Sequence, residues 1–181
     1  GNVSCQMHLN KAEVSVSNRI GEEGVGQEHV FNVVAPYFIA GLAGVYSGLG
    51  EHMLEVSIAH AKERKYTSGT SLAEIETVQI HLAKMYNLVN SSVCTAKEAT
   101  RSAAAGEEDA LAKILSARII ACEMVIEAGR LGMRVGGGKA YNKVGCMERL
   151  LRDAYAGQIM APSADVLTVW LGKAITGLPL V

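Results

Sequence analysis

The stretch GGGKAYNKVGCMERLLRDA, residues 136–154, decides how the second half of the chain folds. It begins with three glycines, continues with seven mostly polar residues and ends in a short charged segment with helical spacing. Glycine permits backbone conformations and close approaches that other residues do not. The stretch therefore predicts a corner between two helices, and it also suits a loop that holds a ligand.

Helices are predicted on both sides of this corner, because apolar residues recur at steps of three and four. The spacing predicts helices over residues 36–65, 71–105, 107–135, 147–156 and 163–177. Ser71 followed by Glu74 is typical of a capping box, and Ser163 suits the N-cap of the last helix. The third helix has a broad apolar arc, which predicts a central helix with partners on two sides.

These helices are joined by short connections, and the 3 prolines lie near expected helix ends. The fold class is therefore all-α, an up-and-down helical bundle. Residues 1–27 differ, because the segment SCQMHLNKAEVSVSNR alternates and predicts two short strands, and IGEEGVG is a turn-rich linker. We expect residues 1–27 to be a short β-hairpin remnant that ends a middle β domain, followed by a C-terminal helical bundle over residues 28–181.

Charge and cysteine content narrow the class of protein. The 17 basic and 18 acidic residues nearly cancel, whereas proteins that bind nucleic acid usually carry a basic excess or a basic face, so we expect no nucleic-acid partner. Cys5, Cys94, Cys122 and Cys146 show no metal-ligand or paired spacing, and no segment resembles a signal peptide. We therefore expect free thiols and a cytoplasmic protein.

The run from Val30 to Gly50 contains no charge and is long enough to cross a bilayer. Its apolar stripe continues past Gly50 into charged sequence, so we interpret it as a buried helix and expect no membrane partner. Each glycine inside such a helix costs about 1 kcal/mol relative to alanine. The four glycines at 41, 44, 48 and 50 therefore predict that a neighbouring backbone or a ligand approaches closely.

No metal site is expected. Di-iron bundles need Glu-x-x-His pairs on facing helices, and the sequence contains none. The stretch RVGGGKAY follows a helix instead of a strand, unlike a dinucleotide-binding fingerprint. His60 falls on the apolar seam of the first helix and His81 lies beside the seam of the second. We interpret both histidines as packing or surface residues.

The order GEEGVG, a long helix ending in AKERK, a helix pair, GGGKAYNKVGCMERLLRDA and PSADVL resembles the acyl-CoA dehydrogenase family over essentially the whole chain. The most specific element is GG followed by ERLLRDA. The resemblance implies the C-terminal helical domain of an FAD flavoprotein, with the tail of the middle β domain before it. It also implies an acyl-CoA thioester substrate, an unknown electron acceptor and assembly as a homo-oligomer, either a dimer or a tetramer.

The same resemblance implies five cofactor-binding residues. Arg64 matches an arginine that reaches the FAD pyrophosphate of a neighbouring subunit. Gly137 and Gly138 match a glycine pair where the backbone passes close to the partner subunit's cofactor. Arg134 stands where the family has a glutamine that faces the cofactor, and Ser163 matches a serine or threonine beside the flavin. The alternative to a cofactor-binding role is helix capping for the glycines and Ser163. For Arg64 the alternative is a favourable interaction with the dipole at the C-terminal end of its helix.

The sequence departs from the family where chemistry is expected. Dehydrogenation needs a carboxylate that removes the α proton of the thioester. At the two positions where the resemblance leads us to expect this base, the chain carries Val144 and Phe38, so no catalytic residue is assigned. Glu76 and Arg134 both replace glutamines, and their opposite charges predict that they pair.

Three functions remain open from the sequence. The first is part of an FAD-dependent acyl-CoA dehydrogenase, of which this chain alone is not expected to be active. The second is a flavin-dependent monooxygenase of the related helical subgroup, which does not need that carboxylate. The third is a binding or assembly relative that keeps the fold and has lost turnover.

Overall fold

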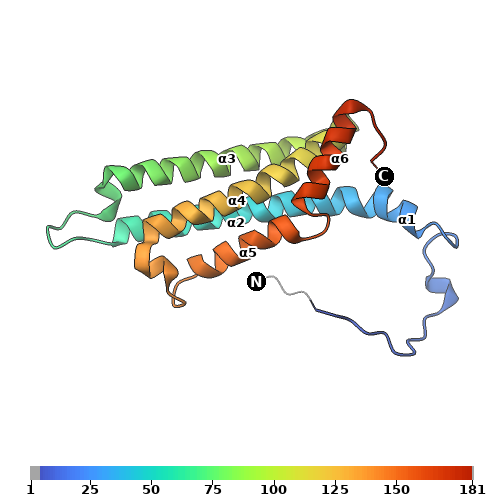
Figure 1. Cartoon of the computed structure of the whole chain (residues 1–181), viewed down its shortest axis with the longest axis horizontal. Coiled ribbons are helices and arrows are strands. Elements are labelled where there is room, and N and C mark those ends of the chain that lie inside the picture. Colours follow the sequence, from blue (N-terminus) through green and yellow to red (C-terminus); the bar gives the residue numbers. More distant parts are fainter. Residues whose placement is uncertain (1–4, 181) are drawn as a thin grey trace.

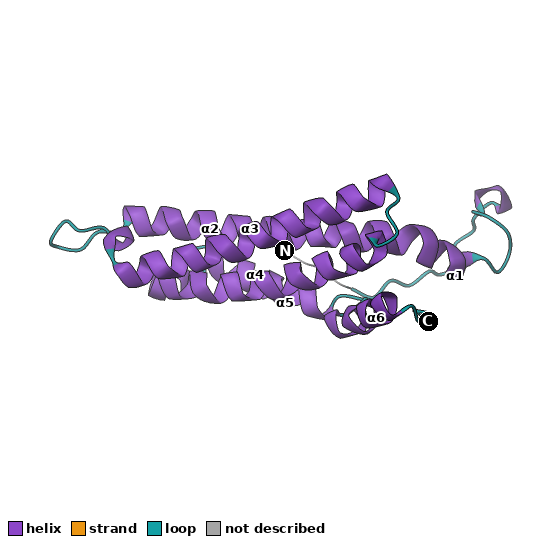
Figure 2. Cartoon of the chain, turned by 90° about the horizontal axis from the view of Figure 1, so that it is seen from above, coloured by secondary structure: helices purple, strands orange, loops and turns teal. Residues whose placement is uncertain are grey.

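The computed structural model describes residues 5–180, whose helices form an elongated bundle (Figure 1). The long helices are α2 (Ala35–Glu63), α3 (Glu76–Ala105) and α4 (Ala110–Tyr141), and the shorter ones are α5 (Met147–Ile159) and α6 (Ala164–Thr176). Minor pieces are η1 (Val16–Asn18), α1 (Gly26–His29), the π-helix η2 (Val30–Val34) and η3 (Leu72–Glu74). Figure 2 shows no strand among the described residues, which confirms the predicted all-α fold class.

Helix α4 lies at the centre of the bundle, as its broad apolar arc predicted. It packs against α2, α3, α5 and α6. Its side chains Leu115 and Val125 are 0% exposed. In Figure 1, α2 and α3 lie along α4, and α5 runs back beside α4. Helix α6 crosses the bundle near one end of α4.

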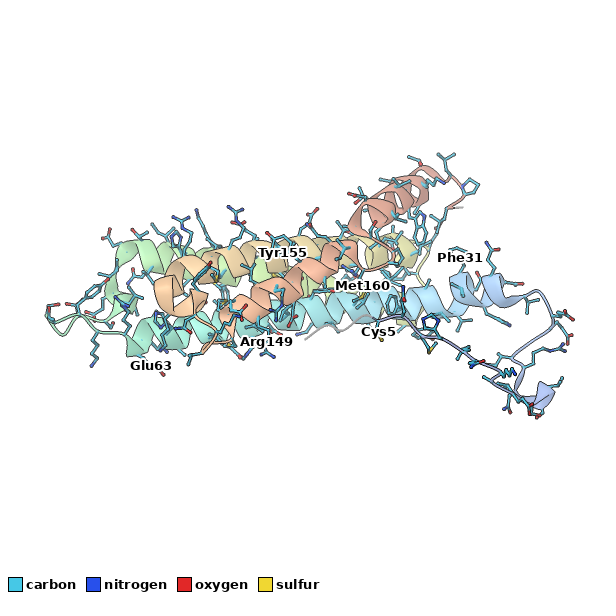
Figure 3. All side chains as sticks on the ribbon, turned by 60° about the horizontal axis from the view of Figure 1, so that its bottom comes forward. Cys5, Phe31, Glu63, Arg149, Tyr155 and Met160 are labelled. Carbon is cyan, nitrogen blue, oxygen red and sulfur yellow. The ribbon has the colours of Figure 1, made fainter. Side chains whose placement is uncertain are left out.

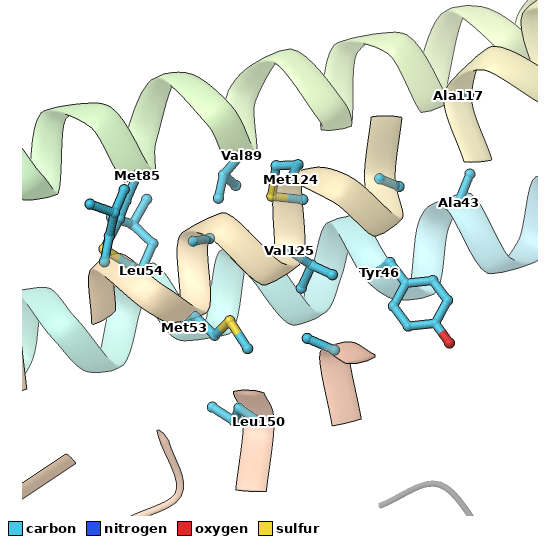
Figure 4. Close-up of a cluster of buried hydrophobic side chains, with 14 of the residues drawn as sticks. Ala43, Tyr46, Met53, Leu54, Met85, Val89, Ala117, Met124, Val125 and Leu150 are labelled. Carbon is cyan, nitrogen blue, oxygen red and sulfur yellow. The ribbon is translucent and has the colours of Figure 1, made fainter. Parts of the chain in front are cut away.

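The core is built mainly from aliphatic and methionine side chains of the four helices α2 to α5. Figure 4 shows Met53 and Tyr46 of α2, Met85 of α3, Val125 of α4 and Leu150 of α5 converging on one interior. Methionine fills irregular gaps because its side chain is unbranched and flexible. The side chains of these helices thus form one apolar core around α4.

One of the four glycines in α2 explains close helix packing within this chain. A Cβ on Gly50 would lie 2.8 Å from the Sδ atom of Met124, so only glycine fits there without rearrangement. Gly41, Gly44 and Gly48 face open space instead. The close neighbour at Gly50 is thus a side chain and not the backbone or ligand that the sequence predicted, and residues 5–180 supply no neighbour for the other three.

The helix ends largely follow the sequence signals. Glu74 accepts hydrogen bonds from the backbone N–H and the hydroxyl of Ser71, at 2.7 and 2.8 Å. This predicted cap begins only the short η3, because Ile75 is extended and α3 starts at Glu76. Ser163 caps α6 by accepting a hydrogen bond from the backbone N–H of Val166, as expected.

The β-hairpin predicted within residues 1–27 is wrong for the described part, residues 5–27. That part contains no strand, and its only regular structure before α1 is η1. Met7, Leu9, Val14 and Val16 are all more than 70% exposed. A two-stranded hairpin is marginal without a third strand or a helix to cover its apolar face, and nothing in residues 5–180 covers it. The predicted domain boundary at residue 27 stays a prediction.

Two further expectations concern the membrane and the cysteines. The helix Gly26–Glu63 is long and apolar enough to cross a membrane, a criterion that core helices of bundles also meet. Its side chains Ile39 and Met53 are 2% and 0% exposed within the bundle, but only 28% of its most apolar 18-residue window is buried. The expectation of no membrane partner therefore stays a prediction. All four cysteines are free thiols, as predicted.

Candidate functional site

One end of the bundle brings together four of the five predicted cofactor-binding residues. Arg64 directly follows α2, and Arg134, Gly137 and Gly138 lie in the last part of α4 (Figure 1, left). A small second core holds these segments together, and its members are Ala61, Leu72, Val78 and Val135. Because it joins the end of α2, η3, the first turn of α3 and the end of α4, it fixes the place of the residues around it.

Arg64 marks the point where the chain leaves α2. Its backbone N–H still donates to the carbonyl oxygen of His60 at 3.0 Å, and its own carbonyl oxygen accepts from Leu72 N at 2.8 Å. The guanidinium carbon lies 5.9 Å from the centre of the Tyr66 ring. The Arg64 side chain is exposed and forms no ion pair with any residue of 5–180, so its charge is available to a ligand.

The structure explains two of the three glycines, at positions 136 and 137, and gives no reason for the third. A Cβ on Gly136 would lie 2.5 Å from the Cβ of Ala140, which the chain folds back against it. Gly137 has φ +52° and ψ −137°, a conformation that favours glycine, and it kinks α4. Gly138 has neither a positive φ nor any neighbour within 4 Å. Gly137 therefore makes the predicted corner, and within residues 5–180 nothing requires glycine at 138.

Arg134 and Glu76 do not form the predicted pair. Both side chains are exposed, and no ion pair links them within the described part of the chain. Glu76 lies in the first turn of α3, where the partial positive charge of the helix end favours a carboxylate by itself. Arg134 is thus left as a second exposed cation at this end.

Ser163 lies apart from the other four residues. It precedes α6, whereas the glycine corner precedes α5, and the 13 residues of α5 separate them. A helix of that length is about 20 Å long. The structure therefore does not place Ser163 in the same site as Arg64 and Arg134.

The loop after the glycine corner carries no acid at the expected position. Val144 is 94% exposed, and its backbone N–H donates to the side-chain oxygen of Asn142 at 2.9 Å. Phe38 is 43% exposed and lies near the start of α2, far along that helix from Arg64. An apolar side chain at either position cannot accept a proton.

A cavity of about 220 Å³ opens beneath this corner, between α2, α4 and the start of α5. Its polar lining includes Ser57, His60 and Glu63 of α2, Lys139 of α4 and the thiol of Cys146. Figure 3 labels Glu63 at this end of α2 and Arg149 on the neighbouring α5. The rest of the lining consists of Val56, Ala59, Ala140, Met147 and the glycines at 132, 136 and 145. The missing side chains at the three glycines leave this part of the cavity open.

The glycine-corner end is electropositive. Its basic side chains form no ion pair among residues 5–180. These side chains are Lys62, Arg64, Lys65, Lys84, Arg134 and Lys139. The acids Glu63, Glu74 and Glu76 lie among them, and the hydroxyl and backbone of Ser71 hold the pKa of Glu74 below its usual value. Unpaired cations around an exposed glycine suit an anionic ligand.

The sequence interpretation did not identify the charged surroundings of two histidines at this end. Burial lowers the pKa of His60 below its usual value, and the charges of Lys139 and Arg64 lower it further. Burial likewise lowers the pKa of His81, with the charges of Arg134 and Lys84 acting in the same direction. Both imidazoles are therefore neutral near pH 7. Helical spacing identified their buried faces, but it could not show which cations come from the neighbouring helix.

Comparison with known proteins defines the class of protein. The family model of the acyl-CoA dehydrogenase C-terminal domain matches residues 40–176. The chain belongs to the acyl-CoA dehydrogenase family. No group of three or more His, Cys, Asp or Glu side chains in residues 5–180 is arranged to hold a metal ion.

Individual relatives agree with this assignment. The chain is 23% identical over 175 residues to cyclohex-1-ene-1-carbonyl-CoA dehydrogenase of Geobacter metallireducens, covering 97% of this chain and 46% of the relative. Among solved structures, PigA with FAD and proline has a TM-score of 0.81 at 20% identity and covers 92% of this chain and 43% of that one. The glutaryl-coenzyme A dehydrogenase complex with glutaryl-CoA has a TM-score of 0.79 at 23% identity, covering 92% and 42%. The chain thus spans slightly less than half the length of these proteins.

Proposed function

We propose that this chain is the C-terminal part of an FAD-dependent oxidoreductase that dehydrogenates an acyl thioester between its α and β carbons. The observation that carries the proposal is the pair of exposed arginines, Arg64 and Arg134, which form no ion pair within residues 5–180 and lie at the same end of the bundle as the open backbone of Gly138. The structure of PigA with FAD and proline, which shares this fold, supports the cofactor, and the glutaryl-coenzyme A dehydrogenase complex with glutaryl-CoA supports the substrate class.

The residues at the glycine corner fit the pyrophosphate of FAD. Two guanidinium groups supply donors and positive charge for phosphate oxygens. The missing side chain at Gly138 lets the cofactor lie against the backbone, which explains a glycine that neither crowding nor dihedral angle requires. When bound, FAD supplies the acceptor for the hydride from the β carbon.

The position of Ser163 suits a second flavin contact. The resemblance assigns Arg64 and the glycines to the cofactor of a neighbouring subunit, and Ser163 to the flavin beside its own helix. The separation along α5 agrees with two cofactors held by one chain in a homo-oligomer. We propose a cytoplasmic dimer or tetramer, and sedimentation as a monomer at micromolar concentration would argue against it.

A flavin-dependent monooxygenase is the second candidate, and one observation favours it. Val144 and Phe38 are apolar, so neither supplies the carboxylate that α-proton removal requires. Dehydrogenation by this protein therefore needs a base outside these two positions, whereas a monooxygenase does not need one.

Anaerobic absorption spectroscopy of the purified protein with a panel of saturated acyl-CoAs separates the candidates. Bleaching of the flavin band is expected if the protein is a dehydrogenase. A flavin band that no acyl-CoA bleaches, together with oxygen consumption by the reduced flavin, would support the monooxygenase. A protein that binds no flavin would instead be a binding or assembly relative.

A further inference from the structure

Two histidines at the glycine-corner end each bury a ring nitrogen that has no hydrogen-bond partner among residues 5–180. His81 of α3 is 9% exposed, and its Nδ1 atom is buried without a partner. His60 of α2 is half-buried, and its Nε2 atom is buried without a partner. Buried polar nitrogens are normally paired, so these two call for an explanation.

Charged groups from neighbouring segments face both rings. The charges of Lys139 on α4, of Arg64 just after α2 and of Glu63 on α2 act on His60, which shares the cavity with the Cys146 thiol. His81 faces Arg134 on α4 and Lys84 on its own helix. The charge of each arginine of the proposed pyrophosphate site therefore acts on one of these two imidazoles, and among residues 5–180 Glu63 is the acid whose charge acts on one of the rings.

The charge balance changes when an anion binds. In the free protein, burial and the adjacent cations disfavour a proton on either ring. A pyrophosphate diester brings two negative charges to Arg64 and Arg134 and offsets the cations that hold the rings neutral. Protonation of the imidazoles then costs less in the complex than in the free protein.

We propose that His60 and His81 couple anion binding at Arg64 and Arg134 to proton uptake, so that the site holds a pyrophosphate diester more tightly at mildly acidic pH. The inference rests on the proposed function, because it uses the same arginines. The sign follows from linkage: the bound state has the higher histidine pKa, so the added affinity is full below the free-state pKa and disappears as pH rises through the bound-state pKa.

Calorimetric titration of the purified protein with ADP-ribose tests this proposal. ADP-ribose is a pyrophosphate diester whose own charge does not change between about pH 6 and about pH 8. We expect its affinity to rise about tenfold from about pH 8 to about pH 6, with net proton uptake measured in buffers of different ionisation enthalpy. Side-chain NMR should show both imidazoles gaining protons on binding.

Glutamine variants separate the two histidines from the rest of the protein. The double variant, which carries both H60Q and H81Q, should bind ADP-ribose with an affinity that does not depend on pH between about pH 6 and about pH 8. H52Q is the matched control, because His52 also lies on α2 but is half-exposed and pairs with Glu55 at 3.5 Å. H52Q should keep the pH dependence of the unaltered protein. If the double variant still bound ADP-ribose with the pH dependence of the unaltered protein, the proposal would be overturned.

The remaining outcomes are also decisive. Binding of ADP-ribose with equal affinity at every pH would overturn the coupling and leave the flavin site intact. Absence of both ADP-ribose and FAD binding would overturn the proposed function and the coupling together. A proton uptake that H52Q removes would assign the effect to a histidine outside the site and overturn the proposal as well.

Discussion

The guanidinium carbon of Arg118 lies 4.7 Å from the centre of the Tyr46 ring, inside the bundle. Its Nη2 atom also donates a hydrogen bond of 2.8 Å to the carbonyl oxygen of Gly157. Arg118 is 1% exposed, so α4 uses one buried cation to hold both α2 and α5. A cation on an aromatic face and a hydrogen bond to a carbonyl compensate part of the cost of burying that charge.

Replacing Gly157 with alanine should loosen this junction. A Cβ there would lie 2.9 Å from the Cβ of Cys122 and 3.1 Å from the Tyr46 ring, and neither neighbour is a flexible chain end. We expect G157A to lower the free energy of unfolding by about 1–3 kcal/mol, measured by urea denaturation.

Gly172 provides the matched control for that substitution. It lies inside α6 with no atom within 4 Å of an added Cβ. G172A should raise the free energy of unfolding by up to about 1 kcal/mol, because alanine favours the helix. Equal destabilisation by the two variants would contradict the packing explanation.

An ion-pair network at the turn between α3 and α4 should make stability depend on acid pH. Lys113 lies 2.8 Å from Glu107, and Arg101 lies 2.7 Å from Glu98. The hydrogen bond from Lys113 lowers the pKa of Glu107 to about 2, and that from Arg101 lowers the pKa of Glu98 to about 2. Because both pKa values are lowered on folding, the ion pairs stabilise the fold fully above the pKa that these glutamates have in the unfolded chain. This stabilisation is lost as the pH falls toward 2.

The variant E107Q measures this contribution. Its melting temperature should fall below that of the unaltered protein near neutral pH, and the difference should shrink as the solution is acidified below about pH 4. Added salt should reduce the difference too, because these side chains are partly exposed. A difference that stays constant with both pH and salt would mean that Glu107 acts by packing alone.

The two glycines of the corner should respond differently to alanine. Gly137 occupies φ +52° and ψ −137°, so G137A should cost about 1–3 kcal/mol of unfolding free energy. Gly138 has no such constraint, and G138A should leave the melting temperature nearly unchanged while lowering the flavin content of the purified protein. Unchanged flavin content in a folded G138A protein would contradict the proposal that the cofactor lies against this backbone.

The fold was predictable where a local signal and the global packing agree. The central position of α4 and the N-cap at Ser163 could both be predicted, because each depends on residues within a few turns of one helix. The strand alternation around Val14 and Val16 misled because strands need partners, and residues 5–180 provide none. Local alternation cannot reveal whether another strand will be present.

The site was predictable only in part, for the same reason. The positive φ of Gly137 and the exposure of Arg64 agree with the interpretation of the motif. The Arg134 and Glu76 pair failed because opposite charge says nothing of distance between side chains on two helices. His60 and His81 were interpreted as packing residues, since the cations that face them come partly from α4, which sequence spacing on α2 and α3 does not show.

Flavin content of the double variant R64Q and R134Q tests the proposed site most directly. R130Q is the matched control, because Arg130 is an exposed arginine of α4 that pairs with Glu127 at 2.8 Å, whereas Arg64 and Arg134 form no ion pair within residues 5–180. We expect the double variant to be folded and to lose most of its bound flavin by absorption spectroscopy, while R130Q keeps it. Flavin retained in full by the double variant, or lost equally by R130Q, would contradict the assignment of the glycine corner as a cofactor site.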